Sequence, residues 1–215
     1  MIKSIVDLRG SFGAARDQHS RPTCLAFAAS DTHAAMRSGW TPLSTEWAYY
    51  HAVKRDGGTP GDGSTLASML ETIKSDGQPR EAHWPYIRNH VIDVASWKPP
   101  GSPAELFFRN HGTQPPDIQE ILDRLDAGSP VLVTMSLSNA FYVPGADGTI
   151  FATEPIDSKR RHAVVAVGYG EKAGARFVLI RNSWGEAWGL QGCAWLAANY
   201  LAPRLIATAI LTTEP

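Results

Sequence analysis

The sequence contains little cysteine, has no long hydrophobic run, and carries no excess charge of one sign. Two of its 215 residues are cysteine, Cys24 and Cys193, so at most one disulfide can form and a four-cysteine zinc site is excluded. No apolar run approaches the roughly 18 to 20 residues that span a bilayer. Residues 1–10 hold too short an apolar segment for a secretory signal. We therefore expect a soluble, unexported protein in a reducing compartment.

The charge distribution argues against nucleic acid and membrane partners. Twenty Lys and Arg residues face 21 Asp and Glu residues, the formal net charge is −1, and no block of like charge occurs. Phosphate binding needs clustered basic side chains, which this sequence lacks. With 43% apolar and 19% charged residues, the chain is long enough to bury a substantial core as one large domain or two compact lobes.

Helical and β-type patterns occupy different halves of the chain. After an extended start at residues 2–8, capping residues and apolar spacing predict helices over 23–39, 44–55, 65–75 and 117–125. The second half carries the β-type runs VLVTMSL, HAVVAVGYG, RFVLIRNSW, GCAWLAAN and LIATAILTT. We expect an α+β protein with a helical first lobe, a mainly antiparallel β second lobe and a cleft between them. The expected bounds are about 11–100 for the helical lobe and about 101–215, with 1–10, for the β lobe.

Cys24 is a candidate nucleophile because it falls in the first turn of a predicted helix. The positive end of the helix dipole favours the thiolate there. A free cysteine is also among the most buried residue types, so packing is the alternative role, and it is the role that we assign to Cys193.

A thiol nucleophile needs a base, and the base needs an orienting partner. His162 opens HAVVAVGYG and Asn182 begins NSWG, so a hairpin through the GEKAGAR turn would bring both side chains to one end of the sheet. Gln18 lies six residues before Cys24, and its amide N–H could join the Cys24 backbone N–H in stabilising an oxyanion. Taken singly, His162 could be a boundary residue and Gln18 an exposed polar one.

Together these residues resemble the papain-like cysteine proteases, peptidase family C1. The order Gln18, Cys24, His162, Asn182, with NSWGEAWGLQG after the asparagine, is similar to the family pattern. LSTEW, WPY, PVLVTM and HAVVAVGYG are similar to further family blocks, so the resemblance covers nearly the whole chain. It implies one catalytic domain over 1–215, with a two-lobed papain-like fold, a helical lobe, an antiparallel β-barrel-like lobe and the active site in the cleft.

The sequence departs from the family around the nucleophile. The family signature C-G-[SA]-C-[WY] is replaced by SRPTCLAF, so the upstream cysteine and its disulfide are lost, and Leu25 stands where an aromatic residue is usual. The spacing between His162 and Asn182 is also longer, and we expect the extra residues to lengthen the turn around Glu171 to Arg176.

The resemblance implies a role for each matching residue. Cys24 would be the nucleophile, His162 would exchange its proton and protonate the leaving amine, and Asn182 would hold the imidazole. Gln18 with the Cys24 N–H would form the oxyanion hole, and Trp184 would shield the bond between Asn182 and His162. The implied activity is that of a cysteine endopeptidase, which hydrolyses peptide bonds through an acyl-enzyme and uses no metal or organic cofactor.

Substrate contacts follow from the same resemblance. GDGSTLASM aligns with the family's Gly-Gly pair, which binds substrate backbone, and Arg160 and Arg161 at the pocket rim favour an anionic group. The expected substrate-binding residues are Gly63, Ser64, Thr65, Leu66, Thr134, Arg161 and Trp184.

Two other functions use the same residues. An amine that resolves the acyl-enzyme would make a peptide ligase or acyltransferase, whereas loss of the chemistry would leave a peptide-binding or regulatory module. We expect a peptide or protein substrate as partner. Because the chain begins almost at the family's mature terminus, we expect either that narrow specificity or a regulatory or inhibitor protein restrains activity, or that a longer precursor has been trimmed. A short, disulfide-free form of this fold suggests a bacterial cytoplasmic enzyme or a delivered effector.

Overall fold

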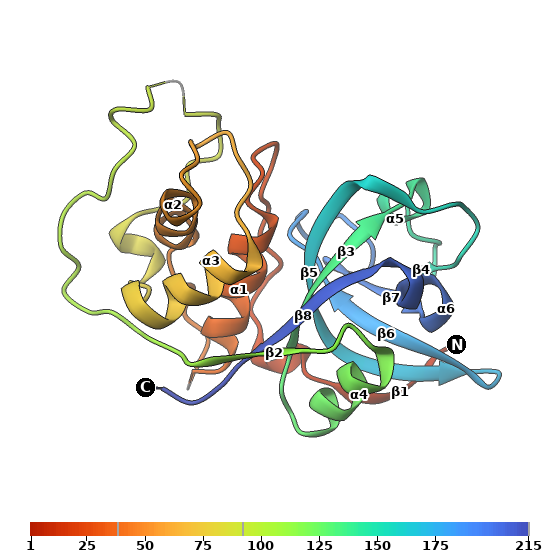
Figure 1. Cartoon of the computed structure of the whole chain (residues 1–215). Helices are drawn as coiled ribbons and strands as arrows, with labels where there is room; N and C mark the ends of the chain where they lie inside the picture. Colours follow the sequence, from red (N-terminus) through yellow and green to blue (C-terminus); the bar gives the residue numbers. More distant parts are fainter. Residues whose placement is uncertain (38, 92, 215) are drawn as a thin grey trace. The chain divides into compact units, whose positions relative to one another are not determined.

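The computed structural model describes residues 1–37, 39–91 and 93–214, and the chain divides into two compact units (Figure 1). The first, which we call the β unit, consists of Met1–Asp17 and Gly112–Ile210. The second, the helical unit, consists of Gln18–His111 and Leu211–Pro215. Mixed α and β structure confirms the predicted α+β class.

A mostly antiparallel sheet forms the core of the β unit. Its strands are β1 (Lys3–Asp7), β2 (His111–Gln114), β3 (Val131–Leu137), β4 (Thr149–Ile150), β5 (Asp157–Lys172), β6 (Ala175–Arg181), β7 (Cys193–Ala197) and β8 (Leu205–Leu211). The strand order is β2-β8-β3-β5-β6-β7-β4, with β1 on β5, and β4 pairs parallel with β7. Among the described residues this order is an open path with β2 and β4 at its ends. The sheet is therefore not closed, in contrast to the barrel-like lobe expected from the resemblance.

Strand β5 is long, and residues 162–170 are buried without interruption, as in a strand covered on both faces. Gly168 is required where β1 crosses it, because a Cβ there would lie 2.3 Å from the Val6 carbonyl oxygen. β5 and β6 stay paired as far as Lys172 and Ala175, which leaves a two-residue turn with positive φ at Ala173 and Gly174. The expectation of a longer turn is thus wrong, because paired strand residues take up the extra length.

Short helices cover parts of this sheet (Figure 1). Helix α4 (Ile118–Asp126) begins where the Asp117 carboxylate accepts the N–H groups of Gln119 and Glu120, and it packs on β5 and β3. Helix α6 (Ala198–Leu201) packs on β6 and β7. The unit also contains α5 (Asn139–Tyr142), η1 (Arg9–Ser11) and η4 (Ala202–Arg204).

The helical unit is built around α1 (Cys24–Ala35), which contacts α2 (Thr45–Arg55) and α3 (Leu66–Glu71). Residues 25–34 of α1 are buried, and many are small, which suits a helix enclosed on every side. Ser44 caps α2 as predicted, whereas the Thr23 side chain, also expected to cap a helix, makes no cap bond. Thr65 caps α3. The third helix is shorter than expected, because a π-helical turn, η2 (Thr72–Asp76), replaces its end. A 3-10 turn, η3 (Glu81–His83), follows.

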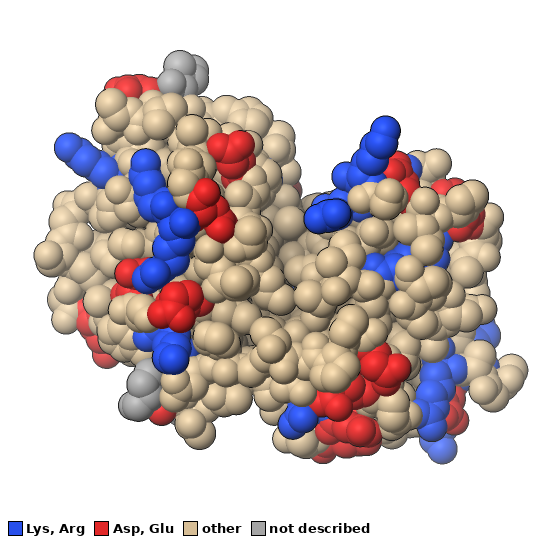
Figure 2. Space-filling model, in the orientation of Figure 1, with Lys and Arg blue, Asp and Glu red and all other residues tan. Residues whose placement is uncertain are grey.

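Figure 2 shows basic and acidic side chains interleaved on the visible face of each unit. This pattern agrees with the near-zero net charge of the sequence. Within the described part of the chain, no helix combines the length and apolar character needed to cross a membrane.

Candidate active site

The β5–β6 hairpin brings His162 and Asn182 together. His162 lies in β5, Asn182 directly follows β6, and the His162 Nε2 atom is 2.7 Å from the Asn182 Oδ1 atom. Both side chains are buried, with exposed fractions of 6% and 2%. The hairpin pairing inferred from sequence therefore produces the contact that it was expected to produce.

The hydrogen bonds around Asn182 define the tautomer of His162. The Ser183 N–H donates to the same Asn182 Oδ1 atom over 2.8 Å, and a backbone N–H can only donate, so this amide atom is an oxygen. The oxygen can only accept, and His162 Nε2 must therefore carry the proton. In the neutral imidazole the Nδ1 atom then keeps its lone pair and can act as a base.

Aromatic rings enclose the imidazole of His162. The Trp184 ring lies 4.9 Å from it and the Phe141 ring 5.7 Å, measured between centroids. Tyr142 stacks on Trp184 at 5.1 Å, and Trp188 Nε1 donates to the Phe141 carbonyl over 3.2 Å, which holds α5 in place. Phe141 and Tyr142 are not among the residues predicted from the sequence, because an FY pair in a short segment carries no pattern that distinguishes it from packing residues.

Burial lowers the pKa of His162 to about 4, and the hydrogen bond to Asn182 opposes that shift only in part. An imidazole in this apolar surrounding is therefore neutral at pH 7 unless an anion lies close to it. A group that accepts a proton from a thiol must be neutral before the transfer. The imidazolium formed by the transfer would then be stabilised by the thiolate formed with it.

Cys24 is the first residue of α1, in the helical unit, and it is half-buried. Its thiol therefore lies in the first helical turn, where the partial positive charge of the helix end favours a thiolate. Cys193 differs, because it is 3% exposed at the start of β7 and burial raises the pKa of its thiol. Neither cysteine forms a disulfide.

Gln18 is held in the loop that leads to Cys24. Its Nε2 atom donates to the Arg21 carbonyl over 3.0 Å, and the Thr23 N–H donates to the same carbonyl over 2.8 Å. Gln18 is 7% exposed, so its amide is a fixed donor group in a mostly buried position. Gln18 and Cys24 thus belong to the helical unit, whereas His162, Asn182 and Trp184 belong to the β unit.

The predicted substrate-binding residues are divided in the same way. Gly63 and Thr65 are exposed, and Thr65 is committed to structure, because its N–H and hydroxyl donate to the Asp56 carboxylate over 2.8 and 2.9 Å. In the β unit, the Thr134 hydroxyl donates to the Ala207 carbonyl over 3.2 Å, and Arg161 is exposed. Of the predicted substrate-binding residues in the helical unit, Ser64 and Leu66 are half-buried.

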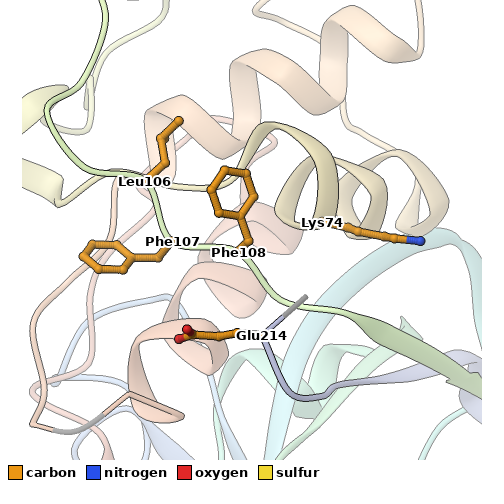
Figure 3. Close-up of a pocket in the computed structure, with 5 residues that line it drawn as sticks. All are labelled: Lys74, Leu106, Phe107, Phe108 and Glu214. Atoms are coloured by element: carbon orange, nitrogen blue, oxygen red, sulfur yellow. The ribbon is translucent and has the colours of Figure 1, made fainter.

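The structure also contains a pocket of about 260 Å³ in the helical unit, and none of the predicted site residues lines it (Figure 3). In Figure 3 the Lys74 amine points away from the phenyl rings, so polar groups do not converge there. Its lining residues are Lys74, Leu106, Phe107, Phe108 and Glu214. Within the described ranges, no cluster of three or more His, Cys, Asp or Glu side chains could hold a metal ion.

Comparison with known sequences gives the family directly. The profile described as papain family cysteine protease matches residues 3–211. The match covers nearly the whole chain, which therefore belongs to the papain family of cysteine proteases.

Individual relatives are distant in sequence. Caricain from Carica papaya is 29% identical over 184 residues, which are 84% of this chain and 51% of caricain. Cathepsin K from Gallus gallus is 30% identical over 139 residues, which are 64% of this chain and 40% of that protein. The chain thus spans about half the length of the relatives that it matches.

Solved structures share the fold. Xylellain, a cysteine protease from Xylella fastidiosa, aligns with a TM-score of 0.82 at 21% identity over 100% of this chain and 88% of its own. Bromelain from Ananas comosus, solved in complex with the E64 inhibitor, aligns with a TM-score of 0.77 at 22% identity over 97% of this chain and 98% of its own. These likenesses show that the fold is papain-like.

Proposed function

We propose that this chain is a cysteine peptidase that hydrolyses peptide bonds through an acyl-enzyme on Cys24, with His162 as acid and base. The observation that carries the proposal is the buried hydrogen bond from His162 Nε2 to Asn182 Oδ1, which leaves Nδ1 as the basic nitrogen. Family membership and the place of Cys24 in the first turn of α1 support it. In this proposal residues 1–215 act as one catalytic domain, with the helical lobe predicted at about 11–100 and the β lobe predicted at about 101–215 plus 1–10.

The proposed reaction has two stages, acylation and deacylation of Cys24, and in each stage one proton passes between the sulfur and the His162 imidazole. Cys24 gives its proton to His162 Nδ1, and the thiolate attacks the scissile carbonyl carbon. The Gln18 amide and the Cys24 N–H stabilise the oxyanion, a contribution of roughly 3 to 4 kcal/mol in comparable sites. His162 protonates the leaving amine as the C–N bond breaks. Water then gives a proton to His162 and attacks the carbonyl carbon of the thioester. The C–S bond breaks, the acid is released, and His162 returns the proton to the Cys24 sulfur.

For substrate contacts we propose the sequence-derived set, with one change in emphasis. Gly63, Ser64 and Leu66 would contact substrate backbone and side chain in the helical unit, and Thr134, Arg161 and Trp184 would do so in the β unit. Thr65 would contribute through its side-chain methyl group, because its N–H and hydroxyl donate to the Asp56 carboxylate and its carbonyl accepts the Met69 N–H. Neither cysteine forms a disulfide, and we further propose a reducing compartment, either a bacterial cytoplasm or that of a cell receiving a delivered effector.

Labelling with a thiol-directed epoxide at pH 6 tests the proposed nucleophile. Only an activated thiolate reacts quickly at that pH, so Cys24 should be labelled and the buried Cys193 should not. Cys193→Ala should retain labelling and Cys24→Ala should lose it. Equal labelling of the two cysteines would end the enzyme assignment and favour a peptide-binding module.

Product analysis tests the reaction itself. A random peptide library incubated with wild type should give cleavage products that are absent with Cys24→Ala. Adding an amine nucleophile separates the rival chemistry: a peptidase gives free acids as the main products, whereas a ligase or acyltransferase gives the amides.

A further inference from the structure

Tyr86, in the WPY segment, makes a set of contacts that the proposed mechanism does not use. Its hydroxyl donates to the Gln18 carbonyl over 2.7 Å and lies 2.9 Å from the Thr23 hydroxyl. One phenolic oxygen therefore bridges the start and the end of the loop that carries Gln18 and leads to Cys24.

The rest of Tyr86 is anchored independently of that hydroxyl. Its ring meets the Phe27 ring of α1 edge-on at 4.7 Å, and its N–H donates to the Glu81 carboxylate over 2.8 Å. The Arg21 guanidinium lies 5.2 Å from the ring centroid. Because the contacts with Phe27 and Glu81 do not involve the hydroxyl, removing the oxygen should leave the ring in place and release the loop.

The loop has a further bond that depends on its shape. Gln18 Nε2 donates to the Arg21 carbonyl, so the amide direction follows the backbone between Gln18 and Arg21. Tyr86 holds the first of these residues by its carbonyl and Thr23, next to Cys24, by its hydroxyl. A change in this bridge would therefore alter the direction of the Gln18 amide before it altered the helix that begins at Cys24.

We propose that Tyr86 is a positioning residue, whose hydroxyl fixes the Gln18–Thr23 loop and thereby aims the oxyanion-stabilising amide of Gln18. This inference rests on the proposed function, since it assigns Gln18 to oxyanion stabilisation. Burial raises the pKa of the Tyr86 phenol, which keeps the hydroxyl protonated and able to donate.

Tyr86→Phe is the test variant, and Tyr169→Phe is its matched control. Tyr86→Phe removes the bonds to the Gln18 carbonyl and the Thr23 hydroxyl, whereas Tyr169→Phe removes the one to the Asp126 carboxylate, over 2.8 Å, in β5 of the other unit. With a fluorogenic peptide amide chosen from the library, Tyr86→Phe should lower kcat about tenfold, less than loss of an oxyanion donor itself, with KM unchanged within about twofold. Alkylation of Cys24 by iodoacetamide forms no oxyanion, so its rate should stay within about twofold of wild type.

A double-mutant cycle with Gln18→Ala separates positioning from general structural damage. If Tyr86 acts through Gln18, adding Tyr86→Phe to Gln18→Ala should change kcat by less than about twofold. An equal tenfold loss in that background, a parallel loss of alkylation rate, or a kcat no lower than that of Tyr169→Phe would each overturn the proposal.

Amide hydrogen exchange tests the same inference without measuring catalysis. It can therefore test whether Tyr86 holds the loop even in the case that wild type cleaves no peptide and the proposed function is wrong. Backbone amides of residues 18–24 should exchange faster in Tyr86→Phe than in wild type, and Tyr169→Phe should leave them unchanged. Unchanged exchange over this segment in Tyr86→Phe would show that the hydroxyl does not hold the loop.

Discussion

Arg21 and Glu46 form an ion pair that is fully buried, with side-chain exposures of 0% on both partners. Two guanidinium nitrogens donate to the two carboxylate oxygens over 2.6 and 2.8 Å. Glu46 also accepts the Ile87 N–H at 3.1 Å and Trp97 Nε1 at 2.7 Å. Arg21 occupies the place of the upstream cysteine in the family signature, three residues before Cys24. A non-covalent anchor therefore fixes the loop that a disulfide would otherwise hold.

Breaking this pair should be costly. Glu46→Ala leaves the Arg21 charge buried without its partner, and we expect a loss of about 3 to 5 kcal/mol in the free energy of unfolding, measured by urea denaturation. Glu105→Ala is the control, because its pair with Arg80 in the same unit is about half exposed, and it should cost under about 1 kcal/mol. Similar losses of stability in both variants would show that the buried pair costs no more to break than the exposed one.

The charge on His162 should depend on Cys24. In Cys24→Ala, we expect the imidazole to titrate with a pKa of about 4, well below the ordinary 6.5, because burial disfavours the charged form. Wild type should titrate higher if a thiolate stabilises the imidazolium. NMR of histidine-labelled protein measures both values. The same pKa in the two proteins would argue against the thiolate–imidazolium pair.

His33 should make stability fall in acid. It is fully buried in α1, its Nδ1 is 2.9 Å from the Gln78 Oε1 atom, and burial lowers its pKa from 6.5 to about 4. Below pH 6.5 His33 becomes protonated in the unfolded chain but stays neutral in the folded chain. Its contribution to the stability of the folded state is therefore complete above pH 6.5 and is lost progressively toward pH 4. The loss is about 2 kcal/mol between pH 7.5 and 5.

His33→Gln, which keeps an N–H donor for Gln78, should remove that share of the pH dependence. Urea denaturation of wild type and variant at pH 7.5 and pH 5 measures it. An identical drop in stability in both proteins would show that His33 does not contribute.

Gly192, which ends the NSWGEAWGLQG segment, should not tolerate a side chain. Its φ is +81°, a Cβ there would lie 2.1 Å from the Ala15 Cβ, and its carbonyl accepts the Asn182 N–H over 2.8 Å. Gly192→Ala should cost more than about 3 kcal/mol, because overlap adds to backbone strain, and it should lower activity through Asn182.

Gly174→Ala is the matched control, because φ is +77° and a Cβ there would have no atom within 4 Å. It should cost about 1 to 2 kcal/mol from strain alone, with activity unchanged. Thermal unfolding and peptide cleavage measure both effects. Equal destabilisation by the two variants would show that overlap with Ala15 adds nothing to the backbone strain.

Local sequence patterns were enough to place most elements. Ser44 caps its helix as expected, because a cap depends on residues within one turn. The contact between His162 and Asn182 also followed from the sequence, because two adjacent β-type runs joined by a Gly-containing turn define a hairpin. The length of that turn did not follow, since the strand register depends on how each face is buried.

What the sequence by itself determined, therefore, is the family, the hairpin and the residue types proposed for the chemistry. The tertiary structure alone decided how those residues are held. The hydroxyl of Tyr86 reaches Gln18 across 68 residues, and Arg21 meets Glu46 across 25. Phe141 encloses His162 from a separate short helix. No local period records such contacts, because they arise only when distant segments pack and each buried polar group must find a partner.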